Sequence, residues 1–377
     1  MSSSQELYNR LSSTLFALVK GTNRKQVANW IWIVVGLLQS NSLALSHMAT
    51  HLPMKTTAEA RVTLIRRWLK NFRVDIWAFY EPILKHVLQG WHAVEACLIL
   101  DGVLVFGDRW QSFRVSLRHG CRAIPLGWVV LAGKGVTSVD KLEGMLTRVA
   151  RVVHGRVKRV IFLADRGFRD CDWAQLCRKL CWNYAIRVMN NTYVTLPDGR
   201  FCRIDRLGVP QGQRRYFQNV LLTRDAKLRT NLSVGWTDGN AKHAPELLAV
   251  ISEPCACRLR LREYGFRMSI EESFRDDKSG GFEMAHTRLQ HADRIERLLL
   301  ALAIATLWCH ELGEDVLSEG EAARRQIDPG ATRELSLFQL GLRWLKRALA
   351  TAVVPLLAFR ARLSDVKLEP LRFLPSS

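Results

Sequence analysis

The sequence lacks any apolar run long enough to cross a lipid bilayer. Its main apolar runs, residues 30–38 and 298–308, are far shorter than the ~20 residues of a membrane-spanning helix, and we expect both to form buried helices. The amino terminus also lacks a basic segment followed by an apolar stretch and a small-residue cleavage site, so we predict no signal peptide. These absences favour a cytoplasmic protein that has no membrane partner.

The sequence also lacks the paired C-x-x-C spacing that is typical of structural zinc sites. Its nine cysteines include only two clusters, in residues 171–181 and 255–257. In the first cluster, offsets of 6 and 4 residues place the thiols on one face of a helix, which indicates core packing. We therefore expect reduced thiols and no structural zinc.

Acidic residues are scarce relative to basic ones. The 377 residues include 55 Lys and Arg but only 35 Asp and Glu, which gives a formal net charge of +20 and a pI near 10. Such an excess favours a polyanionic partner, either nucleic acid or an anionic membrane surface, and the short apolar runs make nucleic acid the better interpretation. The length of the chain suggests two or three domains.

The first 90 residues are predicted to form a helical DNA-binding domain. Within them, residues 55–72 (KTTAEARVTLIRRWLKNF) combine an apolar stripe at helical spacing with the capping-box spacing of Thr56 and Glu59. The stripe consists of Val62, Ile65, Leu69 and Phe72, and the remaining surface carries the basic residues Arg66, Arg67 and Lys70. A helix-turn-helix whose second helix enters a major groove and a solvated basic helix on a bundle fit this pattern equally well.

The pattern then changes to alternating strands and helices. Three strand-like segments are followed by a helix, a strand that ends at Asp165, a second helix and a fifth strand. In chain order these elements are residues 95–107, 112–120, 122–133, 138–155, 158–165, 171–181 and 182–189. The sequence therefore predicts an α/β fold with a mixed sheet, and the order of the elements resembles that of a ribonuclease H-like core.

After residue 190 the pattern becomes one of strands and turns, with hairpin-type Asp-Gly pairs at 198–199 and 238–239. A further strand, the helix that contains Glu271 and a long buried helix then complete the core, and we expect the tail to be loosely packed. The predicted divisions are the helical DNA-binding domain (1–90), the first part of the catalytic core (91–190), a β-rich insertion (191–244), the second part of the core (245–315) and a helical C-terminal region with the tail (316–377).

Two aspartates follow apolar runs that are typical of central strands. Asp101 follows ACLIL and Asp165 follows VIFLA, and a carboxylate in such a place is costly to bury without a partner. If Glu271 on a neighbouring helix joins them, three carboxylates converge and shift one another's pKa values. A bound divalent cation removes this repulsion, and all-oxygen ligands suit Mg²⁺ or Mn²⁺. Two such ions can promote displacement at a phosphodiester.

The segment YGFRMSIEESFRDDK places four polar side chains on one helical stripe. Tyr264, Arg267, Glu271 and Lys278 are separated by 3, 4 and 7 residues, so they fall within roughly 60° on an α-helix. In one interpretation Glu271 binds a metal ion while the two cations hold DNA phosphates. In the other, Arg267 and Glu271 form a surface ion pair worth a few tenths of a kcal/mol. Spacing alone favours neither.

These motifs are similar to those of DDE-type transposases of the insertion-sequence-four family. The pattern Tyr-x2-Arg-x3-Glu-x6-Lys matches the family's Y-R-E-K signature, and residues 98–102 (LILDG) and 163–168 (LADRGF) resemble its two aspartate motifs. The resemblance spans residues 95–312 and includes a β-rich insertion before the glutamate helix. One departure is the Gly-Val pair after Asp101, where members often carry a hydroxyl residue.

The resemblance implies a role for each matching residue. Asp101, Asp165 and Glu271 are expected to be the catalytic triad and to bind the metal, as two Mg²⁺ or Mn²⁺ ions, while Tyr264, Arg267 and Lys278 are expected to contact DNA phosphates. Trp236 is the candidate to stack on a flipped base, with core packing as the alternative. Arg66, Arg67 and Lys70 would contribute to DNA binding.

The resemblance also implies the activity and the partners. The expected protein is a prokaryotic transposase that cleaves element ends and transfers strands to target DNA. Its expected partners are double-stranded DNA, as terminal inverted repeats and target, and a second copy of the chain in a synaptic complex. The alternatives are a catalytically inactive or domesticated DNA-binding protein derived from a transposase, and a ribonuclease H-like nuclease.

Overall fold

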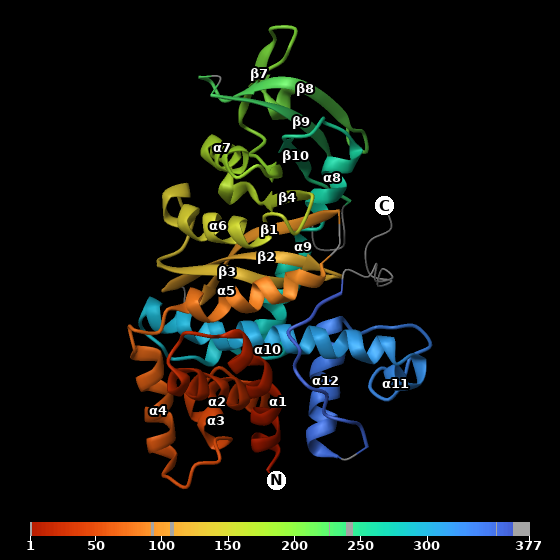
Figure 1. The fold of residues 1–377 in the computed structure, drawn as a ribbon. Helices are drawn as coiled ribbons and strands as arrows, with labels where there is room; N and C mark the ends of the chain where they lie inside the picture. The colour runs from red at the N-terminus through yellow and green to blue at the C-terminus, as the bar shows by residue number, and fades with distance from the viewer. Residues whose placement is uncertain are drawn as a thin grey trace.

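The computed structural model describes residues 2–91, 94–105, 109–225, 227–238, 244–351 and 353–364. These described residues form a mixed α/β fold around one ten-stranded sheet, whose strand order is β3-β2-β1-β4-β5-β10-β9-β8-β6-β7. β1, β4 and β5 run parallel to one another, whereas the remaining neighbours pair antiparallel. Figure 1 shows the sheet in the middle and upper parts of the molecule, with a layer of helices below it.

The elements agree closely with the predicted order. The strands are β1 (Glu95–Val105), β2 (Trp110–His119), β3 (Arg122–Ala132), β4 (Arg159–Ala164), β5 (Asn183–Arg187), β6 (Tyr193–Thr195), β7 (Phe201–Arg203), β8 (Arg215–Leu222), β9 (Leu228–Trp236) and β10 (Leu247–Ser252). The α-helices are α1 (Ser3–Leu18), α2 (Arg24–Ser40), α3 (Leu45–Thr50), α4 (Ala58–Lys70), α5 (Ile76–Val87), α6 (Val139–Val153), α7 (Cys171–Lys179), α8 (Arg258–Gly265), α9 (Met268–Arg275), α10 (Ala292–Ser318), α11 (Glu321–Arg325) and α12 (Leu337–Ala350).

The helices α1 to α5 form a bundle that packs on the long helix α10 (Figure 1). The two apolar runs of the sequence lie within α2 and α10, where Trp30 and Trp308 are fully buried. Both helices are therefore core elements, as their sequences predicted. Within the described ranges, every helix falls short of the length or hydropathy that crossing a bilayer requires.

The predicted start of α4 is wrong by one residue. Thr57, not Thr56, is the N-cap, and its hydroxyl accepts a hydrogen bond from the backbone N–H of Ala60. The predicted apolar stripe is also too long at its end, because the helix ends at Lys70 and Phe72 lies beyond it, 80% exposed. Asn71 ends the helix in an extended conformation, which turns Phe72 away from the core.

The sheet is covered by α6 and α7 on one face and by α8 and α9 on the other (Figure 1). The strands of the predicted insertion do not form a separate sheet. β9 pairs with β10 and so continues the core sheet outward through β8, β6 and β7. The first Asp-Gly turn is confirmed between β6 and β7, where Gly199 has a φ of +85°. The second lies partly outside the described residues, at Gly239.

The described part of the tail is packed, and the expectation of a loose tail is wrong there. Val354, Phe359 and Leu363 are buried, and Arg360 pairs with Glu311 and Asp315 on α10. These buried apolar side chains, spaced four or five residues apart, hold residues 353–364 against the core although the segment has no helix or strand. Residues 365–377 lie outside the described residues.

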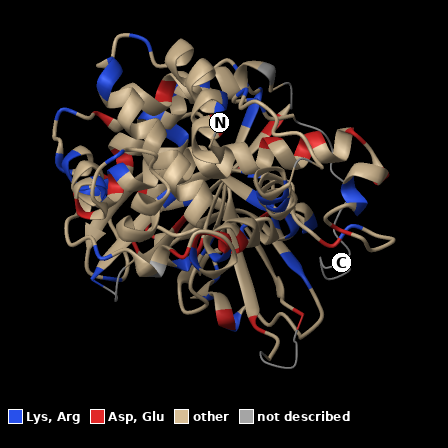
Figure 2. Ribbon diagram, turned by 90° about the horizontal axis from the view of Figure 1, so that it is seen from below, with Lys and Arg blue, Asp and Glu red and all other residues tan. Residues whose placement is uncertain are grey.

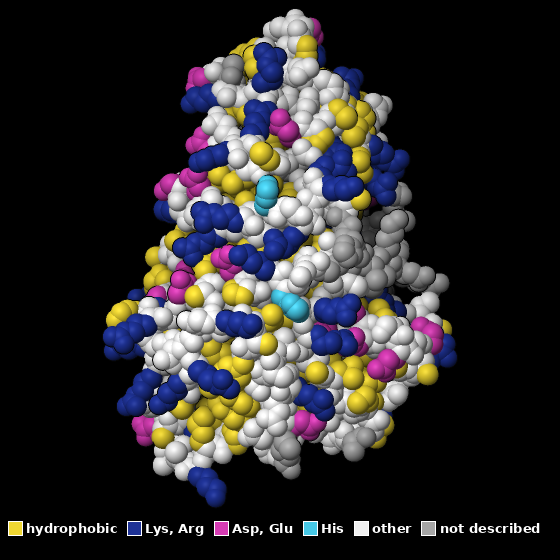
Figure 3. Space-filling view, viewed as in Figure 1, with side chains coloured by type: hydrophobic (Ala, Val, Ile, Leu, Met, Phe, Trp, Pro, Cys, Tyr) yellow, Lys and Arg dark blue, Asp and Glu magenta, His cyan; other side chains and the backbone are white. Residues whose placement is uncertain are grey.

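Positive charge is distributed over most of the surface. In Figure 2 the Lys and Arg residues lie around the periphery of the ribbon and are not confined to one element. Figure 3 shows them on one face from the upper sheet down to the helical layer, with several over α4 at the lower left. The net charge of +20 is therefore presented to solvent from more than one region.

Candidate active site

Asp101 and Asp165 lie side by side on neighbouring parallel strands. Leu100 on β1 is in register with Ala164 on β4, so the next residue along each strand is one of the two aspartates. β4 ends at Ala164, and Asp165 then accepts a 2.7 Å hydrogen bond from the backbone N–H of Gly167. β1 instead continues, because its other edge pairs with β2. The two apolar runs thus bring both carboxyl groups to one place on the sheet.

The backbone beside Asp101 is crowded. Asp101 accepts a 2.7 Å hydrogen bond from the N–H of Gly102, and a Cβ at Gly102 would approach the side-chain amide of Gln111 to 2.6 Å and Phe113 to 3.0 Å. A side chain at this position would force these neighbours to shift. Gly102, which departs from the family pattern, is therefore the residue that fits the space left by Gln111 and Phe113.

Arg267 connects Asp101 to Glu271. Its Nη1 donates to Oδ2 of Asp101 at 2.8 Å, and its Nη2 donates to Oε1 of Glu271, one helical turn further along α9. The side chains of Arg267 and Asp101 are 13% and 16% exposed, so this pair is largely removed from solvent. The residues of the predicted stripe are thus linked to the first aspartate across 166 positions of sequence.

The electrostatics of Asp101 reflect this crowding. Burial raises the pKa of Asp101 to about 6, and the carboxylates of Asp165 and Glu271 act in the same direction, whereas Arg267 and the N–H of Gly102 oppose them. The three carboxyl groups are therefore close enough to repel one another.

The three carboxylates fit a divalent cation by their chemistry. Their donors are all oxygens, which Mg²⁺ and Mn²⁺ prefer, and a cationic guanidinium already lies between Asp101 and Glu271. Among the described residues, however, no group of three or more Asp, Glu, His or Cys side chains is arranged to ligate an ion. Because Arg267 bonds two of the three carboxylates, they can gather around a metal ion only after Arg267 moves.

Tyr264 lies against Arg267 with its hydroxyl group buried. The Tyr264 side chain is 7% exposed, and the guanidinium carbon of Arg267 is 5.8 Å from its ring centroid. Burial raises the pKa of its phenol. The hydroxyl makes no hydrogen bond of standard geometry within the described residues, but the guanidinium groups of Arg267 and Arg187 lie near enough to oppose this rise in pKa.

Lys278 does not lie on a continuous α-helix with the other three residues. α8 ends at Gly265, α9 begins at Met268, and residues Asp276–Gly280 form a π-turn. The buried carboxylates of Asp276 and Asp277 bond Arg122 and Arg114 at 2.5 and 2.6 Å, which anchors this turn to β3 and β2. The expectation of one straight stripe is therefore wrong, and Lys278 is exposed at the turn.

No hydrogen bond or ion pair joins the other predicted DNA-binding residues to the three carboxylates within the described residues. Trp236 ends β9, is partly buried, and donates from Nε1 to the carbonyl oxygen of Val209 at 3.0 Å. Arg66, Arg67 and Lys70 are exposed on α4. Their predicted contacts with DNA stay predictions.

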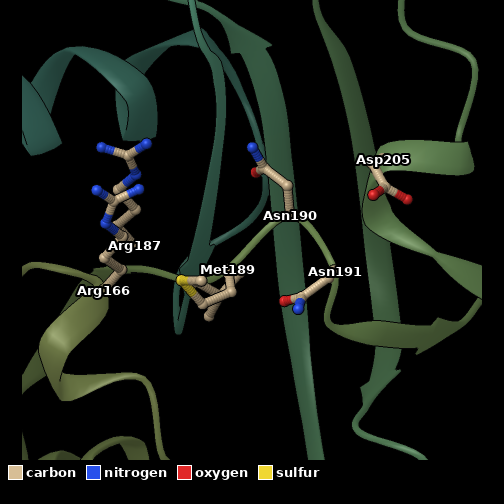
Figure 4. A pocket seen from close by; sticks show the side chains of 7 residues that line it. Arg166, Arg187, Met189, Asn190, Asn191 and Asp205 are labelled. Carbon is tan, nitrogen blue, oxygen red and sulfur yellow. The ribbon is translucent and has the colours of Figure 1, made fainter.

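Sequence reasoning missed a second group of polar residues beside Asp165. Glu246 pairs with both Arg166 and Arg187, at 3.2 and 2.5 Å. The two arginines line a cavity of about 220 Å³ together with Met189, Asn190, Asn191 and Asp205, and Figure 4 shows the two guanidinium groups lying together at one side of it. Arg166 directly follows Asp165, a signal that was available in the sequence, whereas Arg187 has no local signal.

Comparison with known proteins identifies the class. Residues 115–308, more than half of the chain, match the transposase DDE domain family. The chain therefore belongs to this family, which confirms the predicted DDE-type transposase class. Asp165 and Glu271 lie within the matched residues, whereas Asp101 precedes them.

A similar solved structure is titled "Cryo-EM structure of piggyBac transposase synaptic complex with hairpin DNA". It is 10% identical to this chain, with a TM-score of 0.45, and the match covers 93% of this chain and 80% of that one. No curated protein matches the sequence.

Proposed function

We propose that this protein is a DNA transposase of the insertion-sequence-four family that cleaves the ends of its element and joins them to target DNA. The observation that carries the proposal is the register of β1 and β4, which sets Asp101 beside Asp165, together with the bonds through which Arg267 links Asp101 to Glu271. A chance set of surface acids has no reason to converge in this way.

The core is proposed to be ribonuclease H-like. Three antiparallel strands at one side, β3-β2-β1, followed by the parallel strands β4 and β5, support this assignment. The strands β6 to β9 would then be the insertion that precedes the helix with Glu271. The proposed domain divisions are those given by the sequence, with the insertion joined to the core through β10.

Asp101, Asp165 and Glu271 would hold the divalent cation, as one or two Mg²⁺ or Mn²⁺ ions. When bound, such ions polarise the scissile phosphate and assist the attacking and leaving oxygens. The protein contributes the fixed positions of Asp101 and Asp165 on two neighbouring strands and of Glu271 on a helix packed against the sheet.

Arg267 has two proposed partners in turn. It neutralises Asp101 and Glu271 until a divalent cation takes over that role, and its guanidinium then pairs with a phosphate of the bound DNA, for which its planar fork is suited. The buried Tyr264 hydroxyl, which interacts with the guanidinium of Arg267, would donate to the same strand. Lys278 would add a phosphate contact from the exposed π-turn.

The reaction has two chemically balanced steps. In the first, water attacks a phosphodiester at the element's end, the bond to the 3′ oxygen breaks, and a 3′-hydroxyl and a 5′-phosphate are released. In the second, that 3′-hydroxyl attacks a phosphodiester of the other strand or of target DNA, so that one phosphodiester bond forms as another breaks.

DNA recognition is assigned to the parts outside the core. The basic helix α4 with Arg66, Arg67 and Lys70, and the Arg-rich insertion with Trp236, would bind the terminal inverted repeats. Two copies of the chain would assemble with two ends in a synaptic complex in the prokaryotic cytoplasm, where the protein associates with the nucleoid. The charge of +20, presented from several regions (Figure 2), supports a long polyanionic partner.

The test is cleavage of a duplex that carries the terminal inverted repeats found beside the coding region, with Mg²⁺. Asp101→Ala, Asp165→Ala and Glu271→Ala should each lose more than roughly a hundredfold in rate, because a metal ion contributes several kcal/mol to such a reaction. DNA binding should remain.

Asp170→Ala is the matched control. Asp170 is exposed, lies five positions from Asp165, and makes no side-chain cap to α7. Normal cleavage by any of the three triad variants would contradict the assignment, whereas normal binding with no cleavage by the wild-type protein would favour a DNA-binding protein derived from a transposase.

A further inference from the structure

A second cationic cavity lies where the helical layer meets the core. It has a volume of about 190 Å³ and is lined by Arg66 on α4, by Arg288, Leu289 and His291 in the segment before α10, and by Arg294 in the first turn of α10. Leu69 and Leu289 are buried and form an apolar base. Arginines from two distant parts of the sequence thus line one cavity.

Arg66 and Arg288 have no carboxylate partner among the described residues, whereas Arg294 interacts electrostatically with Asp293. None of Arg66, Arg288 and Arg294 is within ion-pair distance of a carboxylate there. The nearest acid in sequence, Asp293, is instead bonded to Arg297 at 2.6 Å. Arg66 and Arg288 are exposed at this cavity and form no ion pair there, so their guanidinium groups can bind an anion.

The cavity is held in shape by buried contacts. Arg297 donates to the carbonyl oxygen of Leu69 at 2.8 Å, which fastens the end of α4 to α10. On the other side of the same helix, Trp68 donates from Nε1 to the carbonyl oxygen of Gln26 at 2.9 Å. The positions of Arg66 and Arg294 are therefore fixed relative to each other before any ligand arrives.

We propose that this cavity, here named the junction cavity, binds one phosphate of the DNA backbone and so joins the contacts made by the helical layer to those made by the core. The inference rests on the proposed function in that DNA is the ligand. Arg67 and Lys70, which follow Arg66 on α4, are also exposed, and Figure 3 shows Lys and Arg side chains over the lower left of the molecule, where α4 lies. A duplex that follows this basic strip would place a phosphate at the cavity, whereas a free phosphate ion would use the cavity alone.

The experiment measures binding of a duplex of unrelated sequence as a function of salt. A phosphate contact carries no sequence information, so the probe does not depend on knowing the element's ends. Arg66→Ala and Arg288→Ala should each weaken binding about tenfold, as expected for loss of a charge-assisted hydrogen bond. Each should also reduce the slope of log affinity against log salt concentration by about one.

The double variant Arg66→Ala/Arg288→Ala decides whether the two arginines share one phosphate. If they do, the double variant should lose little more than either single variant, because residues that serve one ligand are not additive. Additive losses with a slope reduced by about two would show separate phosphates and overturn the junction cavity as one site.

The matched control is Arg325→Ala on α11, which follows the far end of α10, about 40 Å away at 1.5 Å per residue. It removes the same charge and should leave the slope near that of wild type. A second arm measures the shift in thermal midpoint with inorganic phosphate. If phosphate stabilises wild type but not Arg288→Ala, while duplex binding is equal in both, the site takes a free anion and the proposal is wrong.

Failure of this proposal is distinguishable from failure of the proposed function. A protein that is no transposase but binds DNA would still show the salt effects of the junction cavity, yet would not cleave. If the protein is a transposase but no DNA phosphate binds in the junction cavity, the Arg288→Ala variant would cleave DNA normally. Its slope of log affinity against log salt concentration would then equal that of wild type. The exposed arginines make no contact in the core, so these variants are expected to fold.

Discussion

The active site and the junction cavity use arginine in opposite ways. In the active site, Arg267 is bonded to Asp101 and Glu271 and balances their charge. In the junction cavity, Arg66, Arg288 and Arg294 form no ion pair within the described residues, and only Arg294 has a carboxylate, that of Asp293, near enough to interact with it. The first arginine must exchange partners before it can bind a phosphate, whereas the other three are available at once. The same residue type therefore neutralises carboxylates at one place and lines a cavity without an ion pair at another, and we propose that the first arginine exchanges partners while the others bind DNA directly.

Among the substitutions, Asp101→Asn is expected to change stability most, because it removes a carboxylate whose burial destabilises the folded protein. Burial raises the pKa of Asp101 to about 6, above the ~3.9 of an unfolded aspartate, so the folded protein holds the proton more tightly. Stability therefore decreases as the pH rises through this interval, by about 3 kcal/mol in total. Asp101→Asn removes that cost, so its thermal midpoint should equal that of wild type near pH 4 and exceed it at pH 8.

Measuring the thermal midpoint against pH also separates the loss of the Asp101 charge from the change in side-chain shape. Asp170→Asn, at an exposed position, should follow the wild-type midpoint at every pH. A constant difference between Asp101→Asn and wild type from pH 4 to 8 would mean that the carboxylate is not strained by burial. In that case Arg267 would not be needed to balance a buried carboxylate, and the proposed difference between the active site and the junction cavity would be wrong.

Arg267→Ala is expected to destabilise the protein by about 2 kcal/mol without divalent cations, because it leaves Asp101 buried beside two other carboxylates. Mg²⁺ should then raise the thermal midpoint of this variant more than that of wild type, since the metal no longer competes with a guanidinium. Arg275→Ala is the control, because Arg275 pairs with Glu272 at a largely exposed position and such pairs contribute little. Equal Mg²⁺ shifts in wild type and Arg267→Ala would contradict the exchange of partners.

Two arginines on α4 extend the comparison within a single helix. Arg61 donates to the carbonyl oxygens of Ala49, Met54 and Thr56 at 2.9, 3.2 and 2.6 Å, so Arg61→Ala should cost about 2 kcal/mol of unfolding free energy. Arg66→Ala should change that free energy by less than about 0.5 kcal/mol while weakening DNA binding. Urea unfolding of both variants measures the difference, and a destabilised Arg66→Ala would reveal a structural role for Arg66.

Much of the fold could be predicted because its signals are local. The apolar runs that end in Asp101 and Asp165 indicate central strands, and the two strands and one helix between them are consistent with a parallel arrangement of the two runs. The start of α4 was missed by one residue because Thr56 and Thr57 both offer a hydroxyl, and only the folded backbone decides between them.

The parts that could not be predicted depend on contacts between distant segments. The pair of Arg267 with Asp101 spans 166 positions, and nothing near either residue indicates it. The π-turn that displaces Lys278 depends on Arg114 and Arg122, which belong to strands far earlier in the chain. Likewise, no local pattern around Arg288 or Arg294 indicates a cavity, because the cavity forms only where these residues meet α4 in the fold.

The most direct test of the central claim is strand transfer by the wild-type protein. A duplex whose end already carries a free 3′-hydroxyl is mixed with supercoiled plasmid and Mg²⁺, and the products are separated by size. We expect wild type and Asp170→Ala to join the plasmid covalently to the duplex, and Asp165→Ala to form no joined product. Plasmid that is nicked but never joined would identify a nuclease and contradict the transposase.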